Sequence, residues 1–163
     1  MLLVIGLSFY LGKKAKSLQD GEKIAKNKIE TGEAYKKFLE IVMLQGGDIN
    51  YIINTDKYPK SNFTRKVRAL KNGFIKEMDT YSIGMASLEL GAGRRTKDDV
   101  IDHKAGIIFY KKTGDYILKN EIICELFSDS KSRIKLAEQM ILQSIKFSNS
   151  RPRKQKLVKK LIR

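Results

Sequence analysis

The sequence has little of what enzymes use for metal binding and nucleophilic catalysis. Its 163 residues include one cysteine, Cys124, one histidine, His103, and no tryptophan. A structural zinc site draws on several Cys and His ligands, so this composition argues against one. A lone cysteine forms no intramolecular disulfide, which fits a reducing compartment, and we expect a cytoplasmic protein. Cys124 lies in an apolar segment, which favours packing over a catalytic Cys–His pair.

Proline and long apolar runs are also scarce. Two prolines in 163 residues exclude a proline-rich linker. The most apolar run, Leu2–Leu11, is much shorter than the roughly 20 residues that span a bilayer. It also lacks the basic region and the cleavage site of a signal peptide. We therefore expect a buried helix here and no membrane partner.

Charge of one sign dominates the chain. Lys and Arg number 33 against 18 Asp and Glu, a net charge of +15. Such an excess can attract nucleic acid or anionic membranes. The cations are spread along the chain, which favours solvated faces, so nucleic acid is not the expected partner. The exception is the tail at residues 151–163, which has seven cations and no acid. A basic nucleic-acid-binding or interaction module is therefore the alternative function.

The first third of the sequence predicts helices. The apolar run Leu2–Leu11 is one of them. Ser17 followed by Asp20 is typical of a helix N-cap, and Gly32 predicts the end of that second helix. Residues 33–45 carry apolar side chains at amphipathic spacing and stop at a Gly-Gly pair. Residues 48–58 form a connector.

Pro59 marks a boundary, after which short β segments appear. Asn72 and Gly73, between residues 65–70 and 74–78, predict a β-hairpin turn. The further elements expected are a helix at 81–90, strands at 105–110, 116–118 and 121–127, a helix at 129–148 and a closing strand at 157–162. The order predicts an α+β fold, with a helical domain at 1–58 and an α+β domain at 59–163.

One loop is a candidate binding site. In Gly91-Ala92-Gly93-Arg94, small residues would let backbone amides approach an anion, and an arginine can grip a phosphate. No Gly-Lys-Ser/Thr follows, so the loop is not a P-loop. The carboxylates that follow could bind a cation, but nearby Arg and Lys favour ion pairing instead. We expect no metal site. The candidate residues are Gly91, Ala92, Gly93, Arg94, Asp98 and Asp102.

Residues 67–75 and 113–123 resemble the two halves of a biotinyl/lipoyl-type β sandwich. The Met-Lys-Met tip that carries the cofactor in such folds is absent, so we expect no cofactor. Asn120 stands where that pattern often has glycine, a replacement that the left-handed backbone region tolerates.

Taken together and in order, these pieces resemble pyrimidine nucleoside phosphorylases and thymidine phosphorylases. The matching positions are residues 34–38, 45–48, 57–60, 69, 73–75, 83–84, 90–94, 97–102, 105–107 and 111–115. The run LGAGR, followed by KDDVID, is the most specific. The resemblance implies a homodimeric pentosyltransferase that splits pyrimidine nucleosides with phosphate as co-substrate, giving free base and pentose 1-phosphate.

The resemblance covers only the C-terminal portion of that family. It implies that residues 1–58 are the last helices of an α/β domain and that residues 59–163 are the C-terminal domain. The family's phosphate loop and its base-binding residues lie upstream and have no match, so no catalytic, phosphate-binding or base-binding residue is assigned here. We expect a chain that is inactive alone and needs a missing N-terminal catalytic half or a partner subunit. The loop at 91–99, with Arg94, is then a candidate interdomain contact that orders on closure. An apolar patch should lie exposed at Leu2, Val4, Ile5, Phe9, Phe38 and Val42.

Overall fold

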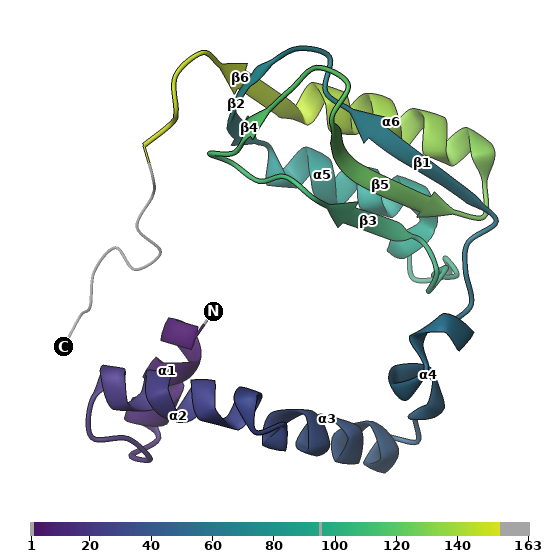
Figure 1. The fold of residues 1–163 in the computed structure, drawn as a ribbon. Helices are drawn as coiled ribbons and strands as arrows, with labels where there is room; N and C mark the ends of the chain where they lie inside the picture. Colours follow the sequence, from purple (N-terminus) through teal and green to yellow (C-terminus); the bar gives the residue numbers. More distant parts are fainter. Residues whose placement is uncertain (1, 95, 154–163) are drawn as a thin grey trace. The chain divides into compact units, whose positions relative to one another are not determined.

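The computed structural model describes residues 2–94 and 96–153 (Figure 1). The chain divides between Tyr58 and Pro59 into two compact units, called unit 1 and unit 2 below. Unit 1 is helical, and unit 2 combines helices with antiparallel strands. The chain therefore has the α+β fold class predicted from its sequence.

Unit 1 is built on a close contact between its first two helices. Its elements are α1 (Leu2–Leu11), α2 (Leu18–Glu30), α3 (Glu33–Leu44), α4 (Asn50–Ile53) and η1 (Thr55–Lys57). A Cβ atom added to Gly21 of α2 would lie only 2.2 Å from the Gly6 carbonyl oxygen of α1. The predicted N-cap is confirmed, since the Ser17 hydroxyl accepts a hydrogen bond from the Asp20 amide at 3.1 Å. Gly32, with φ of 75°, separates α2 from α3.

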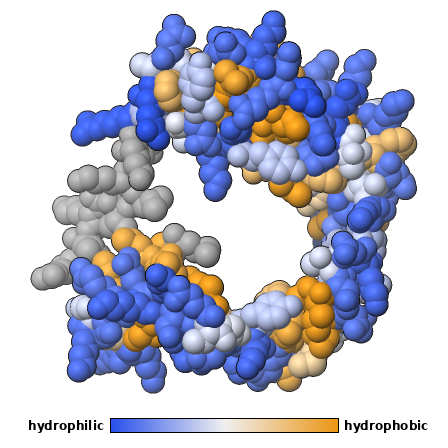
Figure 2. Space-filling model, in the orientation of Figure 1, coloured by the Kyte–Doolittle hydropathy of each residue, from blue (hydrophilic) through white to orange (hydrophobic). Residues whose placement is uncertain are grey.

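Much of the apolar surface of unit 1 is exposed. No residue of α3 is buried, and Leu44 at its end is 81% exposed. Of the predicted patch, Val4 (62%) and Phe38 (47%) are exposed. The other members are half-buried: Leu2, Ile5, Phe9 and Val42. Figure 2 shows hydrophobic residues, in orange, over α1 and towards the end of α3.

Unit 2 contains two three-stranded antiparallel sheets within its described residues. Its elements are β1 (Phe63–Arg68), β2 (Gly73–Met78), α5 (Thr80–Ser87), η2 (Leu88–Ala92), β3 (Gly106–Phe109), β4 (Tyr116–Ile117), β5 (Ile122–Ser128), α6 (Lys131–Ser144) and β6 (Ile145–Ser148). The strand orders are β1-β5-β3 and β4-β2-β6. Helix α6 contacts α5, β1 and β5. Strands β3, β4 and β5 confirm the three predicted after residue 104.

The core of unit 2 is apolar and lies between α6 and the strands. Ile134, Ala137 and Ile141 are buried on α6 at the spacing of one helical face. Ile75 of β2 and Leu126 of β5 belong to the same buried cluster. Each fully buried isoleucine or leucine stabilises the fold by about 1.5–3 kcal/mol relative to an exposed one.

The predicted hairpin at Asn72 and Gly73 is wrong. Strand β1 pairs with β5, whereas β2 pairs with β4 and β6. The Asn72 side-chain oxygen instead accepts a hydrogen bond from the Lys119 amide at 2.7 Å. The chain thus passes from one sheet to the other at this point. A local turn signal is overridden because Val67 and Ile75 are both fully buried in pairings with strands far away in the sequence.

The predicted helix at 129–148 is also too long. Helix α6 ends at Ser144, and residues Ile145–Ser148 form β6, paired with β2. Met78 of β2 lies opposite Ile145, and Ile75 lies opposite Phe147. Pairing with the β2 edge thus stabilises residues 145–148 as a strand, although their apolar spacing would also fit a longer helix. The predicted connector at 48–58 contains the short helices α4 and η1.

The structure does not test two of the predictions made from the sequence. The strand expected at 157–162 lies outside the described residues. The biotinyl/lipoyl comparison stays a prediction, although Asn120 does adopt a left-handed backbone, with φ of 69°. Within residues 2–94 and 96–153, no helix combines the length and apolar character needed to cross a membrane.

Candidate functional site

The candidate loop begins where a glycine ends a helix. Helix α5 is followed by the π-helical turn η2, in which Gly91 adopts φ of 107° and ψ of 3°. Residues with a side chain rarely adopt this backbone conformation, whereas glycine adopts it freely. A Cβ atom at Gly91 would also lie 3.1 Å from Nη1 of Arg133 and 3.5 Å from Cβ of Asp102. The structure thus gives Gly91 a backbone reason to be glycine, independent of any anion.

The structure brings together some of the candidate residues and not others. The Asp102 amide donates to the Gly91 carbonyl at 2.9 Å and closes the loop. The Asp102 carboxylate accepts from the Lys104 amide at 3.0 Å. Arg94 and Asp98 are exposed and make no hydrogen bond or ion pair within the described residues. Ala92 and Gly93 are half-buried.

A tight turn inside the loop engages the third nearby carboxylate. Asp99 accepts hydrogen bonds from the Thr96 amide at 3.1 Å and from the Thr96 hydroxyl at 2.9 Å. This geometry caps a turn and does not gather carboxylates around a cation. In the part of the chain that the structure describes, no group of three His, Cys, Asp or Glu residues could hold a metal ion.

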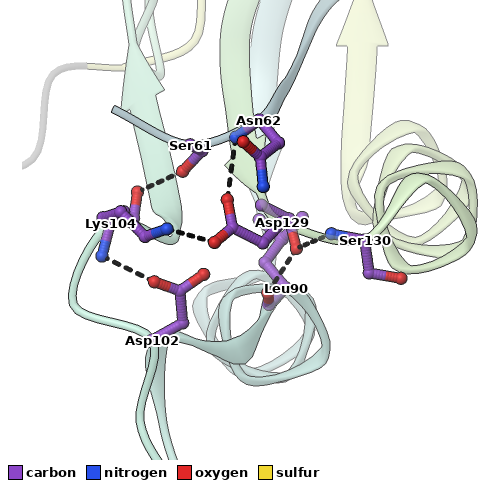
Figure 3. A network of polar contacts seen from close by, with 8 residues as sticks. Ser61, Asn62, Leu90, Asp102, Lys104, Asp129 and Ser130 are labelled. Carbon is purple, nitrogen blue, oxygen red and sulfur yellow. Dashed lines mark hydrogen bonds and ion pairs between the residues drawn. The ribbon is translucent and has the colours of Figure 1, made fainter. Parts of the chain in front are cut away.

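A polar network anchors the chain just after the loop (Figure 3). Lys104 forms an ion pair with Asp129, whose carboxylate also accepts from the Asn62 amide at 2.8 Å. The Ser61 hydroxyl donates to the Lys104 carbonyl at 2.8 Å. The Lys104 ammonium, followed by the Asn62 amide, holds the pKa of Asp129 below its ordinary value. This Lys104–Asp129 network joins the start of unit 2 to the loop.

A buried hydroxyl anchors the other end of the loop. Ser128 is 1% exposed, and its hydroxyl donates to the Leu90 carbonyl at 2.7 Å while accepting from the Ser130 amide at 3.2 Å. Carbonyls at a helix end lack intrahelical partners, so this bond satisfies one of them. Hydrogen bonds therefore hold the loop at both of its ends.

Sequence reasoning missed most of these anchors. Lys104 and Asp129 are 25 residues apart, and Asn62 and Asp129 are 67 residues apart. No local pattern pairs residues at such separations. Asp129 and Ser130 come directly before helix α6, but Ser130 makes no side-chain cap bond, and this pattern does not point to Lys104 or Asn62.

A shallow pocket of about 430 Å³ lies beside the loop. Its lining residues are Leu88, Glu89, Gly91, Gly93, Asp99, Val100 and Arg133. Among these described lining residues, Arg133 carries a guanidinium, and Glu89 and Asp99 carry carboxylates. Val100 is 92% exposed.

The remaining nucleophile is inert. Cys124 is fully buried in β5, and burial, with a smaller effect from Glu138, raises the pKa of its thiol to about 12. A thiol with this pKa is protonated at neutral pH and is a poor nucleophile. His103 is exposed on the loop side. These two residues supply no catalytic pair.

Comparison with known proteins shows which family and which enzymes this chain is similar to. Residues 74–148 match the family described as pyrimidine nucleoside phosphorylase C-terminal domain. The chain is 37% identical over 121 residues to a pyrimidine-nucleoside phosphorylase of Staphylococcus epidermidis, covering 74% of this chain and 28% of the relative. It is 29% identical over 149 residues to that of Geobacillus stearothermophilus, covering 91% and 34%.

A further relative is shorter. The thymidine phosphorylase of Metamycoplasma hominis is 30% identical over 141 residues, covering 86% of this chain and 52% of the relative. The chain thus spans between 28% and 52% of the length of the three relatives named here. The matched segment 74–148 contains the loop, the Lys104–Asp129 pair and the core of unit 2 except Val67 and Ala69.

Proposed function

We propose that this chain, whose residues 74–148 match the pyrimidine nucleoside phosphorylase C-terminal domain family, forms the C-terminal portion of such an enzyme. The parent reaction is phosphorolysis of a pyrimidine nucleoside to free base and pentose 1-phosphate, with phosphate as co-substrate. The observation that carries the proposal is the alignment with the Metamycoplasma hominis thymidine phosphorylase, which covers 86% of this chain.

The loop supplies the contact surface in this proposal. Gly91 and Asp102 are joined by a backbone hydrogen bond, so the segment between them is held as a closed loop. Arg94 stands exposed on it, with no partner in the described residues. An exposed guanidinium can form two parallel hydrogen bonds with a carboxylate or phosphate that approaches it. Arg94 then contacts the catalytic part when the nucleoside cleft closes.

The chain alone is proposed to be inactive. Cys124 is buried with a pKa of about 12, and His103 is exposed without a paired base in the described residues. The groups that bind phosphate and base are therefore proposed to come from an N-terminal portion.

The exposed apolar side of unit 1 supports a covering partner. Phe38, Ile41 and Leu44 of α3 are 47%, 45% and 81% exposed. Exposed apolar patches of this kind mark interaction surfaces. The relatives are two to more than three times as long as the part that aligns, so they contain enough chain to cover it. We assign the covering role to the N-terminal portion; a homodimer of this chain would be seen instead as a concentration-dependent mass in sedimentation.

A fusion protein tests the proposal. The N-terminal portion of the Staphylococcus epidermidis relative, up to the 121-residue aligned region, is joined to this chain. The fusion should cleave thymidine or uridine only when phosphate is present. A soluble, folded fusion without activity would count against the proposal.

The loop is tested inside the same fusion. Arg94→Ala should lower kcat/KM about 10- to 100-fold, because a charge-assisted hydrogen bond contributes about 1.5–3 kcal/mol. Lys97→Ala, which removes an exposed cation from the same loop, is the matched control and should change little. Equal kinetics for both variants would remove Arg94 from the mechanism.

A further inference from the structure

We propose that the free edge of β1 binds an extended, acidic segment of a partner polypeptide as an added strand, an interaction beyond phosphorolysis. The strand order β1-β5-β3 leaves β1 with a single neighbour, β5, among the described strands (Figure 1). An open pocket of about 460 Å³ is lined by residues 63–66 of β1 together with Glu125, Lys131 and Ile134. It is called the β1-edge pocket below.

The lining shows that this pocket follows the strand edge and does not lie over one face of the sheet. Val67 is fully buried, and Arg65, two residues earlier, lies on the same face, where its Nε is 3.7 Å from the carboxylate of Glu138 in α6. Thr64 and Lys66 alternate with Arg65 and therefore lie on the opposite face. A pocket lined by four consecutive residues thus receives side chains from both faces, and the edge runs between them.

The unpaired backbone groups of β1 face the same pocket. The amide of Tyr110, directly after β3, donates to the Ile123 carbonyl of β5 at 2.9 Å. Bonding direction alternates along an antiparallel strand, so the backbone groups of Leu126, three residues further on, point at β1. Arg65 lies opposite Leu126, and its own backbone groups serve that pairing. The amides and carbonyls of its two neighbours, including Thr64, therefore face away from β5 and are available to an added strand.

The described lining of the β1-edge pocket is mainly basic. Arg65, Lys66 and Lys131 contribute three cations, against the one carboxylate of Glu125. Lys66 and Lys131 are exposed and form no ion pair within residues 2–94 and 96–153. The Glu125 carboxylate accepts a hydrogen bond from the Tyr110 hydroxyl at 2.9 Å. Because the cations lie on both faces of β1, the pocket favours acidic side chains on both faces of the strand that it receives.

Charge also narrows the choice of occupant. The chain carries a net charge of +15, and residues 151–163 include seven cations and no acid. A basic edge therefore disfavours both this tail and a second copy, since charges on an edge strand keep like chains from pairing. A nucleic acid would meet the same cations but has no strand backbone to pair with β1. An acidic polypeptide segment gains both the backbone hydrogen bonds and the ionic attraction, and Phe63, 40% exposed, adds an apolar contact.

The test is fluorescence anisotropy with the full 163-residue chain and a labelled, acetylated octapeptide made of two Glu-Glu-Val-Val repeats. In an extended strand, this order places glutamate and valine on each face. Saturable binding is expected at about 50 mM salt and should weaken as salt rises. The same peptide with glutamine in place of glutamate should bind about tenfold more weakly, because several exposed ion pairs are lost.

Backbone pairing is tested separately from charge. Thr64→Pro removes an amide that faces the open edge, a position at which an edge strand accepts proline. It should weaken peptide binding about 5- to 10-fold through the lost hydrogen bond, whereas Thr64→Val should change little. Circular dichroism establishes that each variant is folded. N-methylation of the peptide at its odd or its even positions tests the same point without changing the chain, and only one of the two forms should bind, since alternate amides face β1.

The cations are tested with a matched pair of double variants. Lys66→Gln/Lys131→Gln should lower the affinity about tenfold at about 50 mM salt and little at about 1 M salt, where exposed charges are screened. The control, Lys76→Gln/Lys119→Gln, removes two exposed lysines outside the β1-edge pocket and the same total charge. It should leave the affinity nearly unchanged.

Five results would overturn the proposal. These are no binding of the acidic peptide at low salt, equal affinities for the glutamate and glutamine peptides, equal affinities for the two N-methylated peptides, equal effects of the two double variants, and tighter binding of labelled oligo(dT) that depends on Lys66 and Lys131. The last result would assign the pocket to nucleic acid. None of these readouts depends on phosphorolysis, so their failure is distinct from failure of the parent function.

Discussion

Replacing Gly91 by alanine should destabilise unit 2 at the base of the candidate loop. Gly91 has φ of 107°, a backbone conformation that costs a residue with a side chain about 1–3 kcal/mol. The added Cβ would also lie 3.1 Å from Nη1 of Arg133, which is the end of a flexible side chain and can move. It would lie 3.5 Å from Cβ of Asp102, an ordinary contact. Backbone strain therefore dominates, and we expect a loss of about 2 kcal/mol in the free energy of unfolding.

The matched control is Gly84→Ala in the preceding helix. Gly84 lies in α5 without a positive φ, and an added Cβ would meet no atom within 4 Å. Alanine is favoured over glycine in a helix by about 1 kcal/mol, so this variant should be more stable than the parent. The same substitution is thus expected to act with opposite signs at two glycines seven residues apart.

The assay is thermal and urea unfolding followed by far-UV circular dichroism. For a unit of about 100 residues, each 1 kcal/mol corresponds to roughly 4–8 °C in Tm. Gly91→Ala should therefore lower Tm by about 8–16 °C, and Gly84→Ala should raise it by about 4–8 °C. Equal Tm values for Gly91→Ala and the parent would refute the reasoning, because they would mean that the loop backbone relaxes without cost.

Three further predictions concern charge, reactivity and helix packing. The pKa of Asp129 is held low by Lys104, so its contribution to stability is present above the ordinary Asp pKa and disappears as pH falls through the folded value; Asp129→Asn should flatten acid unfolding in that window, and an unchanged profile would contradict this. Cys124, buried with a raised pKa, should react with a thiol reagent slowly in the native chain and rapidly in urea; fast native labelling would exclude the buried position. Gly21→Val should separate α1 from α2, because a Cβ would lie 2.2 Å from the Gly6 carbonyl oxygen; a fragment of residues 1–58 with unchanged helicity and Tm would show that the contact is not needed.

Local signals in the sequence predicted local structure well. The Ser17 cap and the glycine at position 32 are confirmed because their effects involve neighbours within a few residues. The apolar segment around Cys124 located β5 within one residue of its observed limits, Ile122–Ser128. Helical periodicity identified α6 but not its end, since Ile145 continues the apolar spacing while pairing with Met78 in a sheet.

These local signals could not predict which distant segments pair with one another. Asn72 and Gly73 have the residues of a hairpin turn, yet the flanking strands pair elsewhere. For the candidate loop, the sequence identified Gly91 and Asp102, which do contact one another. It missed the Lys104–Asp129 ion pair, because residues 25 positions apart share no periodic pattern. Whether Arg94 and Asp98 take part in closure stays a prediction.

We propose that this chain forms the C-terminal portion of a pyrimidine nucleoside phosphorylase and that the groups that bind phosphate and base lie in an N-terminal portion. The most direct measurement is release of thymine or uracil from thymidine or uridine by the purified 163-residue chain, with and without phosphate. We expect no release by the chain alone, and phosphate-dependent release once it is fused to the N-terminal portion of a relative. Phosphate-dependent release by the chain alone would refute this proposal, since the active site would then be built from these residues.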